Sequence, residues 1–182
     1  MNEQSTKLSQ VMAVVSTAAQ TEADAMALAL TPGRAKPGEF DFLIGEWRIS
    51  HRRLTSSGVW DAFAGEATCW TVWAGAGLIE ELRIPARDFT GMGVRLIDAE
   101  KGLWSDVWVN ATSGVLRGPG MIGGFVNGEG WFVADETDGD TPIKVRGIWD
   151  RITGTAHGWR QSVSRDGGAT WEDNWLMDWT KV

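Results

Sequence analysis

The sequence predicts an all-β domain, an antiparallel barrel of about 8–10 strands that follows an N-terminal helix. After Gly45, short segments rich in Val, Ile, Phe and Trp are separated by turn-forming residues at intervals of roughly 8 to 12 residues. No helical pattern interrupts these segments, and the short connections between them favour antiparallel neighbours. A closed barrel would also remove the strand edges that such segments otherwise expose.

The N-terminal part of the chain differs from the rest, because residues 1–31 contain no Trp or Phe and are rich in Ala, Gln, Ser and Thr. Apolar residues recur there at intervals of three and four, which predicts a helix over 9–30. Pro32-Gly33 would end it. We therefore divide the chain into a helix and linker, 1–38, and a barrel domain, 39–182. The helix is expected to pack on the barrel or to form a homo-oligomer with a second copy.

The barrel domain opens with the segment 40–54, in which an apolar lead-in precedes Gly45 and a two-residue alternation follows it. Such alternation is typical of a strand with one covered face and one wet face. The face expected to be covered carries Trp47, Ile49, His51 and Arg53.

This opening resembles the first strand of lipocalin-like (calycin) β-barrels, in which a Gly-x-Trp plugs the closed end. The run Phe40-Asp41-Phe42-Leu43-Ile44-Gly45-Glu46-Trp47 is similar to the start of a family of bacterial calycin-like domains of unknown function. The resemblance covers residues 40–181. It implies an antiparallel calycin-like barrel with Trp47 at its closed end.

The segment Ser164-Arg165-Asp166-Gly167-Gly168-Ala169-Thr170-Trp171 resembles the Asp-box turn of sialidases. In such a turn the Asp side chain binds backbone N–H groups and a Gly adopts a positive φ. Sialidases repeat the box and use a Tyr nucleophile, whereas this chain has the box once and contains no Tyr. We therefore interpret the segment as a stable hairpin and not as part of a glycosidase.

The composition limits the partners that this protein can have. The 182 residues include 17 basic and 24 acidic side chains, a net charge of −7, which argues against nucleic acid or an anionic membrane surface as a partner. No apolar run reaches the length of roughly 18–20 residues that a membrane span needs. The single cysteine, Cys69, excludes an internal disulfide and fits a cytoplasmic location. The 12 Trp residues are typical of a lined pocket or an aromatic core.

Polar residues that share a strand face with Trp are the candidates for a site inside the barrel. His51 shares its face with Trp47, and His157 shares its face with Trp159. Asp106 alternates with two further Trp residues on 103–110, so an internal His near it is a candidate general base. The catalytic candidates are His51, His157 and Asp106. The candidates for ligand contact are Trp47, Trp104, Trp108, Trp159, Gln161 and Arg83.

The orientation of two strands stays open at this point. On 103–110 apolar residues occupy both faces, and Asp106 is internal if Trp104 and Trp108 face the interior. On 78–84, either Glu80, Leu82 and Ile84 face the interior, or Ile79, Glu81 and Arg83 do. On 90–98, Arg95 lies opposite Met92, Val94 and Leu96.

No metal or other cofactor is expected. The two histidines are about a hundred residues apart and have no Cys partner, which is a weak set of metal ligands. Haem held by one internal His, as in the nitrobindin branch of the calycins, is an alternative, but the Gly-rich opening strand of that branch is not matched here.

Three functions remain open after these observations. The first is a module that binds a small apolar or aromatic molecule in a Trp-lined barrel cavity. The second is a cofactor-independent cyclase, isomerase or lyase, possible in specialised metabolism, which uses an internal His or carboxylate as acid and base. The third is an oligomeric scaffold assembled through residues 1–31.

Overall fold

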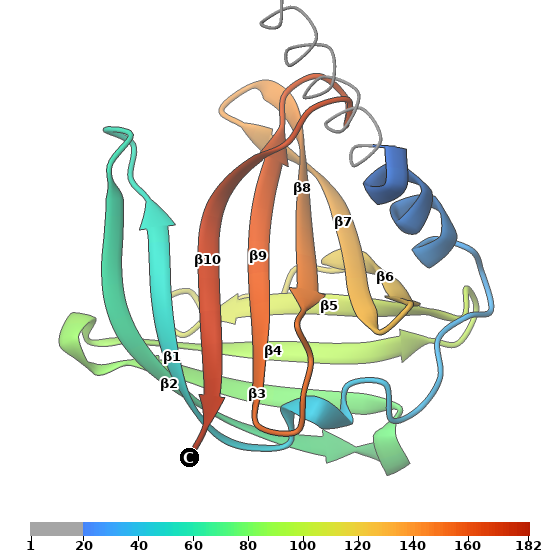
Figure 1. Cartoon of the computed structure of the whole chain (residues 1–182), viewed down its shortest axis with the longest axis horizontal. Helices are drawn as coiled ribbons and strands as arrows, with labels where there is room; N and C mark the ends of the chain where they lie inside the picture. Colours follow the sequence, from blue (N-terminus) through green and yellow to red (C-terminus); the bar gives the residue numbers. More distant parts are fainter. Residues whose placement is uncertain (1–19) are drawn as a thin grey trace, which may run out of the picture.

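A computed structural model describes residues 20–182, and within them the alternating segments form ten strands. Each strand pairs antiparallel with its neighbours in the sequence, and β1 pairs with β10 to close the barrel (Figure 1). The all-β antiparallel barrel predicted from the sequence is therefore confirmed. The strands are β1 (Gly45–Leu54), β2 (Trp60–Val72), β3 (Gly77–Ile84), β4 (Phe89–Asp98), β5 (Leu103–Asn110), β6 (Met121–Val126), β7 (Glu129–Asp138), β8 (Thr141–Asp150), β9 (Ala156–Ser164) and β10 (Glu172–Lys181). Short 3-10 helices are η1 (Asp41–Leu43), η2 (Trp73–Gly75) and η3 (Pro85–Arg87).

The two-residue alternation of β1 sets its inner and outer faces as the sequence predicts as far as His51, whereas Arg53, also expected on the covered face, is exposed. Trp47, Ile49 and His51 are buried inside the barrel, while Arg48 and Ser50 between them are exposed. Because successive side chains of a strand point to opposite faces, this alternation fixes which side chains enter the core.

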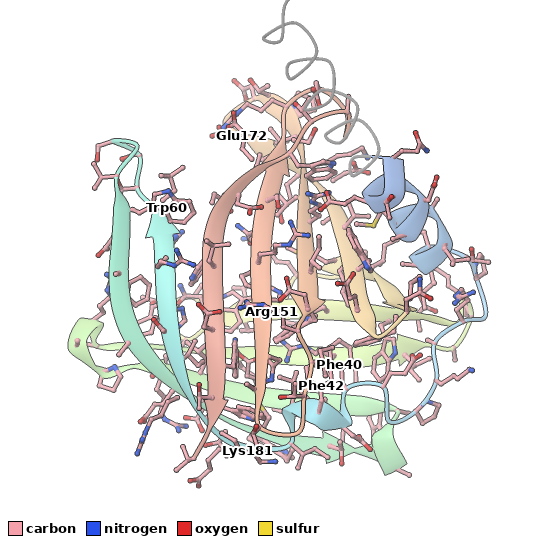
Figure 2. All side chains as sticks on the ribbon, in the orientation of Figure 1. Phe40, Phe42, Trp60, Arg151, Glu172 and Lys181 are labelled. Atoms are coloured by element: carbon pink, nitrogen blue, oxygen red, sulfur yellow. The ribbon has the colours of Figure 1, made fainter. Side chains whose placement is uncertain are left out.

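One end of the barrel is closed by the apolar lead-in to β1. Phe40 packs edge-on against Trp104, at 4.9 Å between ring centroids, and against Phe125, at 5.0 Å. Trp47 is buried just inside this end and its indole Nε1 donates a hydrogen bond to the Leu43 carbonyl, at 2.6 Å. Figure 2 shows Phe40 at the end of the barrel opposite Trp60. The opposite end, where β1 finishes and β2 begins, stays open.

The N-terminal helix, 20–29, lies on the outside of the barrel beside β6, β7 and β8 (Figure 1). Its residues Ala25, Met26 and Ala29 pack against Trp131 and Ile148 on the outer wall. The predicted helix over 9–30 is thus present over 20–29, whereas its first half, with Val11, Met12 and Val15, lies outside the described residues. The division of the chain at residue 38 stays a prediction. Within residues 20–182, no helix is both long and apolar enough to cross a membrane.

The linker after this helix runs along the closed end and is tied to it by backbone hydrogen bonds. The N–H of Gly33 donates to the Lys101 carbonyl, at 2.9 Å, and the N–H of Ala35 donates to the Gly102 carbonyl, also at 2.9 Å. A Cβ on Gly102 would come within 2.5 Å of the Gly33 Cα, so this close approach of two backbones requires glycine.

The last hairpin has the internal bonds expected of an Asp-box turn. Asp166 Oδ1 accepts a hydrogen bond from the Thr170 N–H, at 2.9 Å, and Asp166 Oδ2 accepts one from the Thr170 hydroxyl, at 2.7 Å. These bonds, with that from Ser164, hold the pKa of the Asp166 carboxyl well below its usual range. Because the Asp166 side chain bonds within its own hairpin, the segment acts as a structural turn.

Candidate functional site

A cavity of about 360 Å³ occupies the barrel interior between the aromatic closed end and the open end. This volume lies in the range of roughly 300–1,000 Å³ that is usual for small-molecule sites. Five indoles line it, from Trp108, Trp149, Trp159, Trp175 and Trp179. The other lining residues are Glu80, Leu82, Arg95, Asp106, Arg117, Gly120, Met121, Glu136, Gln161 and Met177. The cavity therefore joins a mostly aromatic wall to a small set of charged groups.

Three charged side chains from neighbouring strands form the floor of this cavity: Glu80 on β3, Arg95 on β4 and Asp106 on β5. Arg95 is paired across the sheet with Asp106. Its Nη2 lies 2.7 Å from Glu80 Oε2, and its Nε lies 3.3 Å from Asp106 Oδ2. The three side chains are 5%, 3% and 14% exposed for Arg95, Glu80 and Asp106. Such burial is compatible with folding because each charge faces an opposite one.

The pKa values of the floor residues shift because the groups are buried and close to one another. Burial raises the pKa of the Glu80 carboxyl, nearby Asp106 adds to this rise, and Arg95 opposes it without cancelling it. Burial alone would lower the pKa of Arg95, but Asp106 and Glu80 outweigh it, and Arg95 stays charged. The floor thus holds a fixed positive charge and an adjacent carboxyl whose pKa is raised by burial.

Two glycines on the inner face of β4 make room for these side chains. A Cβ on Gly93 would lie 2.9 Å from Arg95 Nη1 and 3.2 Å from Glu80 Oε2. A Cβ on Gly91 would overlap the indole of Trp108, which also stacks on Phe89 at 6.4 Å between ring centroids. Glycine at both positions therefore lets the floor and one indole of the wall lie flat against the strand.

His51 is buried inside the barrel but does not line the cavity. Its ring stacks on Phe63, at 4.7 Å between centroids, and its Nδ1 accepts a hydrogen bond from Trp175 Nε1, at 3.2 Å. Burial, with a smaller effect of Arg87, lowers the pKa of His51 to about 4. The residue is therefore a neutral acceptor that orients Trp175, and Trp175 stands between it and the cavity.

His157 lies deeper, in the aromatic closed end. Its ring is 4.4 Å from that of Trp47, 5.0 Å from that of Trp179 and 5.1 Å from that of Phe42. Burial, then Arg95 and Arg151, lower the pKa of His157 to about 3. The sequence placed both histidines inside the barrel, and they are inside, but neither lines the cavity or bonds to Asp106. The haem alternative relied on one internal histidine as the iron ligand, and no histidine among residues 20–182 lines this cavity.

The other residues selected from the sequence divide into three groups. Asp106, Trp108, Trp159 and Gln161 line the cavity, and the amide of Gln161 donates to Asn174 Oδ1, at 3.0 Å. Trp47 and Trp104 belong to the closed end instead.

Trp104 does not reach the cavity because its indole Nε1 donates to Glu39 Oε2, at 2.9 Å, below the floor. Arg83 was also expected to contact the ligand, but it does not line the cavity. It points outward from β3, where it pairs with Glu66, at 2.9 Å, and with Glu81, at 3.3 Å. The inner face of β3 is the one that carries Glu80, because Arg95 on the next strand compensates the buried carboxyl.

Sequence reasoning missed Glu80 and Arg95 as site residues, along with the indoles of Trp149, Trp175 and Trp179. One signal could have found the charged pair. Once Asp106 is placed inside because it alternates with Trp, a buried carboxylate requires a cation on an adjacent strand. Arg95 is the only basic residue of β4, and the hairpin register pairs it with Asp106.

Metal ligands are not clustered in this part of the chain: residues 20–182 contain no group of three or more His, Cys, Asp or Glu side chains placed to hold an ion. Cys69 is buried, and burial, followed by the charge of Glu80, raises the pKa of its thiol. The thiol therefore stays protonated and unreactive.

Two solved structures resemble this fold weakly. The chain is similar to Rv2717c from M. tuberculosis, with 12% sequence identity and a TM-score of 0.46, over 78% of this chain and 93% of that one. It is also similar to the NPUN_R4044 protein of unknown function, from the DUF3598 family of Nostoc punctiforme, with 14% identity and a TM-score of 0.42. That match covers 85% of this chain and 51% of the other. No protein-family model and no curated protein matches the sequence.

Proposed function

We propose that this barrel binds a small, largely apolar molecule with aromatic rings in its Trp-lined cavity. The observation that carries the proposal is the combination of five indoles around a space of about 360 Å³ with a rigid set of paired charges at its floor. Aromatic walls supply most of the binding energy through apolar contact and ring stacking. A few fixed polar groups then set the orientation of the ligand.

The experiment compares two tryptophans of similar exposure. Trp108 lines the cavity and is 42% exposed, whereas Trp70 is 44% exposed and lies on the outer face of β2. A set of neutral bicyclic aromatic compounds is screened by quenching of Trp emission, and binders are confirmed by equilibrium dialysis. We expect Trp108→Ala to weaken binding about tenfold or more, from the loss of one stacked ring, and Trp70→Ala to leave it unchanged. Equal effects of the two substitutions would refute binding in the cavity.

A second candidate function, a cofactor-independent acid–base enzyme, is favoured by Glu80. This carboxyl lines the cavity, is almost fully buried and has a raised pKa, as a general acid requires. Asp106 provides a second carboxyl nearby. The version in which His51 or His157 is the base remains a proposal, but both imidazoles lie outside the cavity lining.

Binders from the screen can be tested for turnover with a pair of substitutions. If the barrel is an enzyme of this kind, Glu80→Gln should lower the rate by about 10²–10⁴-fold with binding retained. His51→Ala should have little effect on the rate. The opposite result would favour the histidine mechanism. If no binder is turned over, only the binding function remains supported.

Membership of the calycin superfamily and a cytoplasmic location remain proposals based on the sequence. So does homo-oligomerisation through the N-terminal helix.

A further inference from the structure

Three side chains that line the cavity carry buried hydrogen-bond donors for which residues 20–182 provide no acceptor. Arg95 Nη1, Trp149 Nε1 and Trp179 Nε1 are buried and have no hydrogen-bond partner among residues 20–182. All three belong to side chains that line the cavity. Buried polar groups in proteins are nearly always paired, so three unpaired donors in one wall require an explanation.

The three side chains are neighbours. The guanidinium carbon of Arg95 lies 5.0 Å from the ring centroid of Trp149, and the rings of Trp149 and Trp179 are 5.8 Å apart between centroids. Two other polar groups of the same wall are paired, Gln161 with Asn174 and Trp175 with His51. Glu80 Oε2 has no hydrogen-bond partner among residues 20–182, although it lies 2.7 Å from Arg95 Nη2 in an ion pair. The unpaired donors of the cavity-lining side chains are therefore gathered in one contiguous region, at and beside the floor.

The charges at the floor indicate what kind of acceptor is missing. Arg95 already faces two carboxyl groups, at 2.7 Å from Glu80 and 3.3 Å from Asp106. A ligand carboxylate would bring a third acidic group to a single guanidinium in a buried site, where like charges repel strongly. A neutral oxygen acceptor avoids this repulsion and still accepts from N–H donors.

We propose that the ligand of this cavity is an aromatic compound that carries a neutral carbonyl group, bound with its oxygen on the donors of Arg95, Trp149 and Trp179. This inference rests on the proposed binding function and specifies its ligand class. The indole walls hold the rings, and the three donors fix the carbonyl end.

The test uses three probes with the same ring system: naphthalene, 2-acetylnaphthalene and 2-naphthoate. Dissociation constants for the full chain are measured by equilibrium dialysis at pH 7. We expect 2-acetylnaphthalene to bind about tenfold more tightly than either of the other two, the scale of one or two hydrogen bonds made by otherwise unpaired buried donors.

Substitutions that remove a donor but keep a ring locate the effect. Trp149→Phe and Trp179→Phe should each reduce the preference for the ketone over naphthalene, taken as the ratio of the two dissociation constants, several-fold. Trp131→Phe is the matched control, because Trp131 is also buried with an unpaired Nε1 but lies on the outer wall beneath the helix. This control should keep the full preference for the ketone.

The outcomes separate the two proposals. If none of the three probes binds, the binding function itself is wrong. If naphthalene binds as tightly as the ketone, the binding function stands and the carbonyl inference is wrong. If 2-naphthoate binds most tightly, the site accepts an anion and the neutral ligand class is wrong. A preference for the ketone that Trp131→Phe abolishes as well would place the donors elsewhere.

Discussion

The two halves of the barrel interior are both rich in tryptophan but differ in what the tryptophans contact. In the closed half, Phe40 packs on Trp104 and Trp47 packs on His157. The indole N–H of Trp47 donates to the Leu43 carbonyl, and that of Trp104 donates to Glu39. In the open half, the indoles surround a cavity of about 360 Å³ with a charged floor. Tryptophan content therefore predicts an aromatic interior, whereas unfilled space beside fixed charges marks the candidate site. The predictions that follow test this division.

The largest effect on stability is expected in the closed half. Trp47→Ala should lower the free energy of unfolding by about 3–5 kcal/mol, because it leaves a cavity in a filled core. It also leaves the Leu43 carbonyl without its bond. Trp108→Ala should cost about 1 kcal/mol or less, because Trp108 is 42% exposed at the mouth. Urea denaturation gives both values, and similar losses for the two variants would show that the halves do not differ.

A loss of about 3–5 kcal/mol is also expected for Arg95→Met, because two buried carboxyl groups would lose their cation. Arg83→Met is the control on the next strand, where the arginine pairs with Glu66 and Glu81 on the exposed outer wall. Surface pairs of this kind contribute about 1 kcal/mol or less. If chemical denaturation finds Arg95→Met no more destabilising than Arg83→Met, the charged floor is not a structural element.

The pH dependence of stability should distinguish the two buried histidines from the carboxyl of Glu80 at the cavity floor. His51 and His157 have folded-state pKa values of about 4 and about 3, below the ordinary 6.5, so the unfolded chain binds more protons below pH 6.5. Their contribution is fully present above pH 6.5 and is lost as the pH falls toward 3–4. Between pH 7 and pH 5 the loss should reach about 2–4 kcal/mol for the two together.

Glu80 has the opposite sign, because its raised pKa gives stability that is lost as the pH rises above its unfolded value. His157→Phe should therefore reduce the loss of stability on acidification, as measured by urea denaturation at pH 7 and pH 5. Glu80→Gln should leave that acid-side loss in place. A His157→Phe variant that loses as much stability as the wild type between these pH values would contradict a buried neutral imidazole.

Removal of the helix on the outer wall should have a smaller effect on stability than Trp47→Ala or Arg95→Met. Removing residues 1–36 should leave the β-sheet signal in circular dichroism and lower the free energy of unfolding by about 1–3 kcal/mol. The reasons are exposure of Trp131 and Ile148 and loss of the Glu22 pairs with Arg146 and Arg160. Light scattering of the same variant tests whether this segment mediates assembly. Loss of all folded protein would show that the helix belongs to the core of the fold.

Much of the fold could be predicted from the sequence because the strands and turns follow from patterns of neighbouring residues. Turn residues at regular spacing gave the strand-rich barrel, and the alternation around Trp47 gave the inner face of β1. The same patterns failed where tertiary contacts decide. Trp131 faces outward, contrary to the expectation that Trp marks the inner face, because the N-terminal helix covers it.

The site was harder to predict because alternation gives the face of a strand but not the height along it. Trp104 and Trp108 share the inner face of β5, but four residues separate them, about 13 Å along a strand. Trp104 therefore lies in the closed end and Trp108 at the mouth of the cavity. His157 lies near the start of β9 and therefore in the closed end, whereas Gln161, four residues further along that strand, reaches the cavity. Glu80 faces inward beside Arg95 on the neighbouring strand. The pattern within one strand cannot show such a contact between strands.

The most direct test of the central claim follows the tryptophan indole N–H resonances by NMR, because tryptophans occur in both halves of the interior and on the outer wall. Each indole is assigned with a Trp→Phe variant, and 2-acetylnaphthalene is titrated into the full chain. We predict large shifts for Trp108, Trp149, Trp159, Trp175 and Trp179, and little change for Trp70, Trp73 and Trp131. Shifts confined to the outer tryptophans, or spread equally over all of them, would contradict a binding site in the cavity.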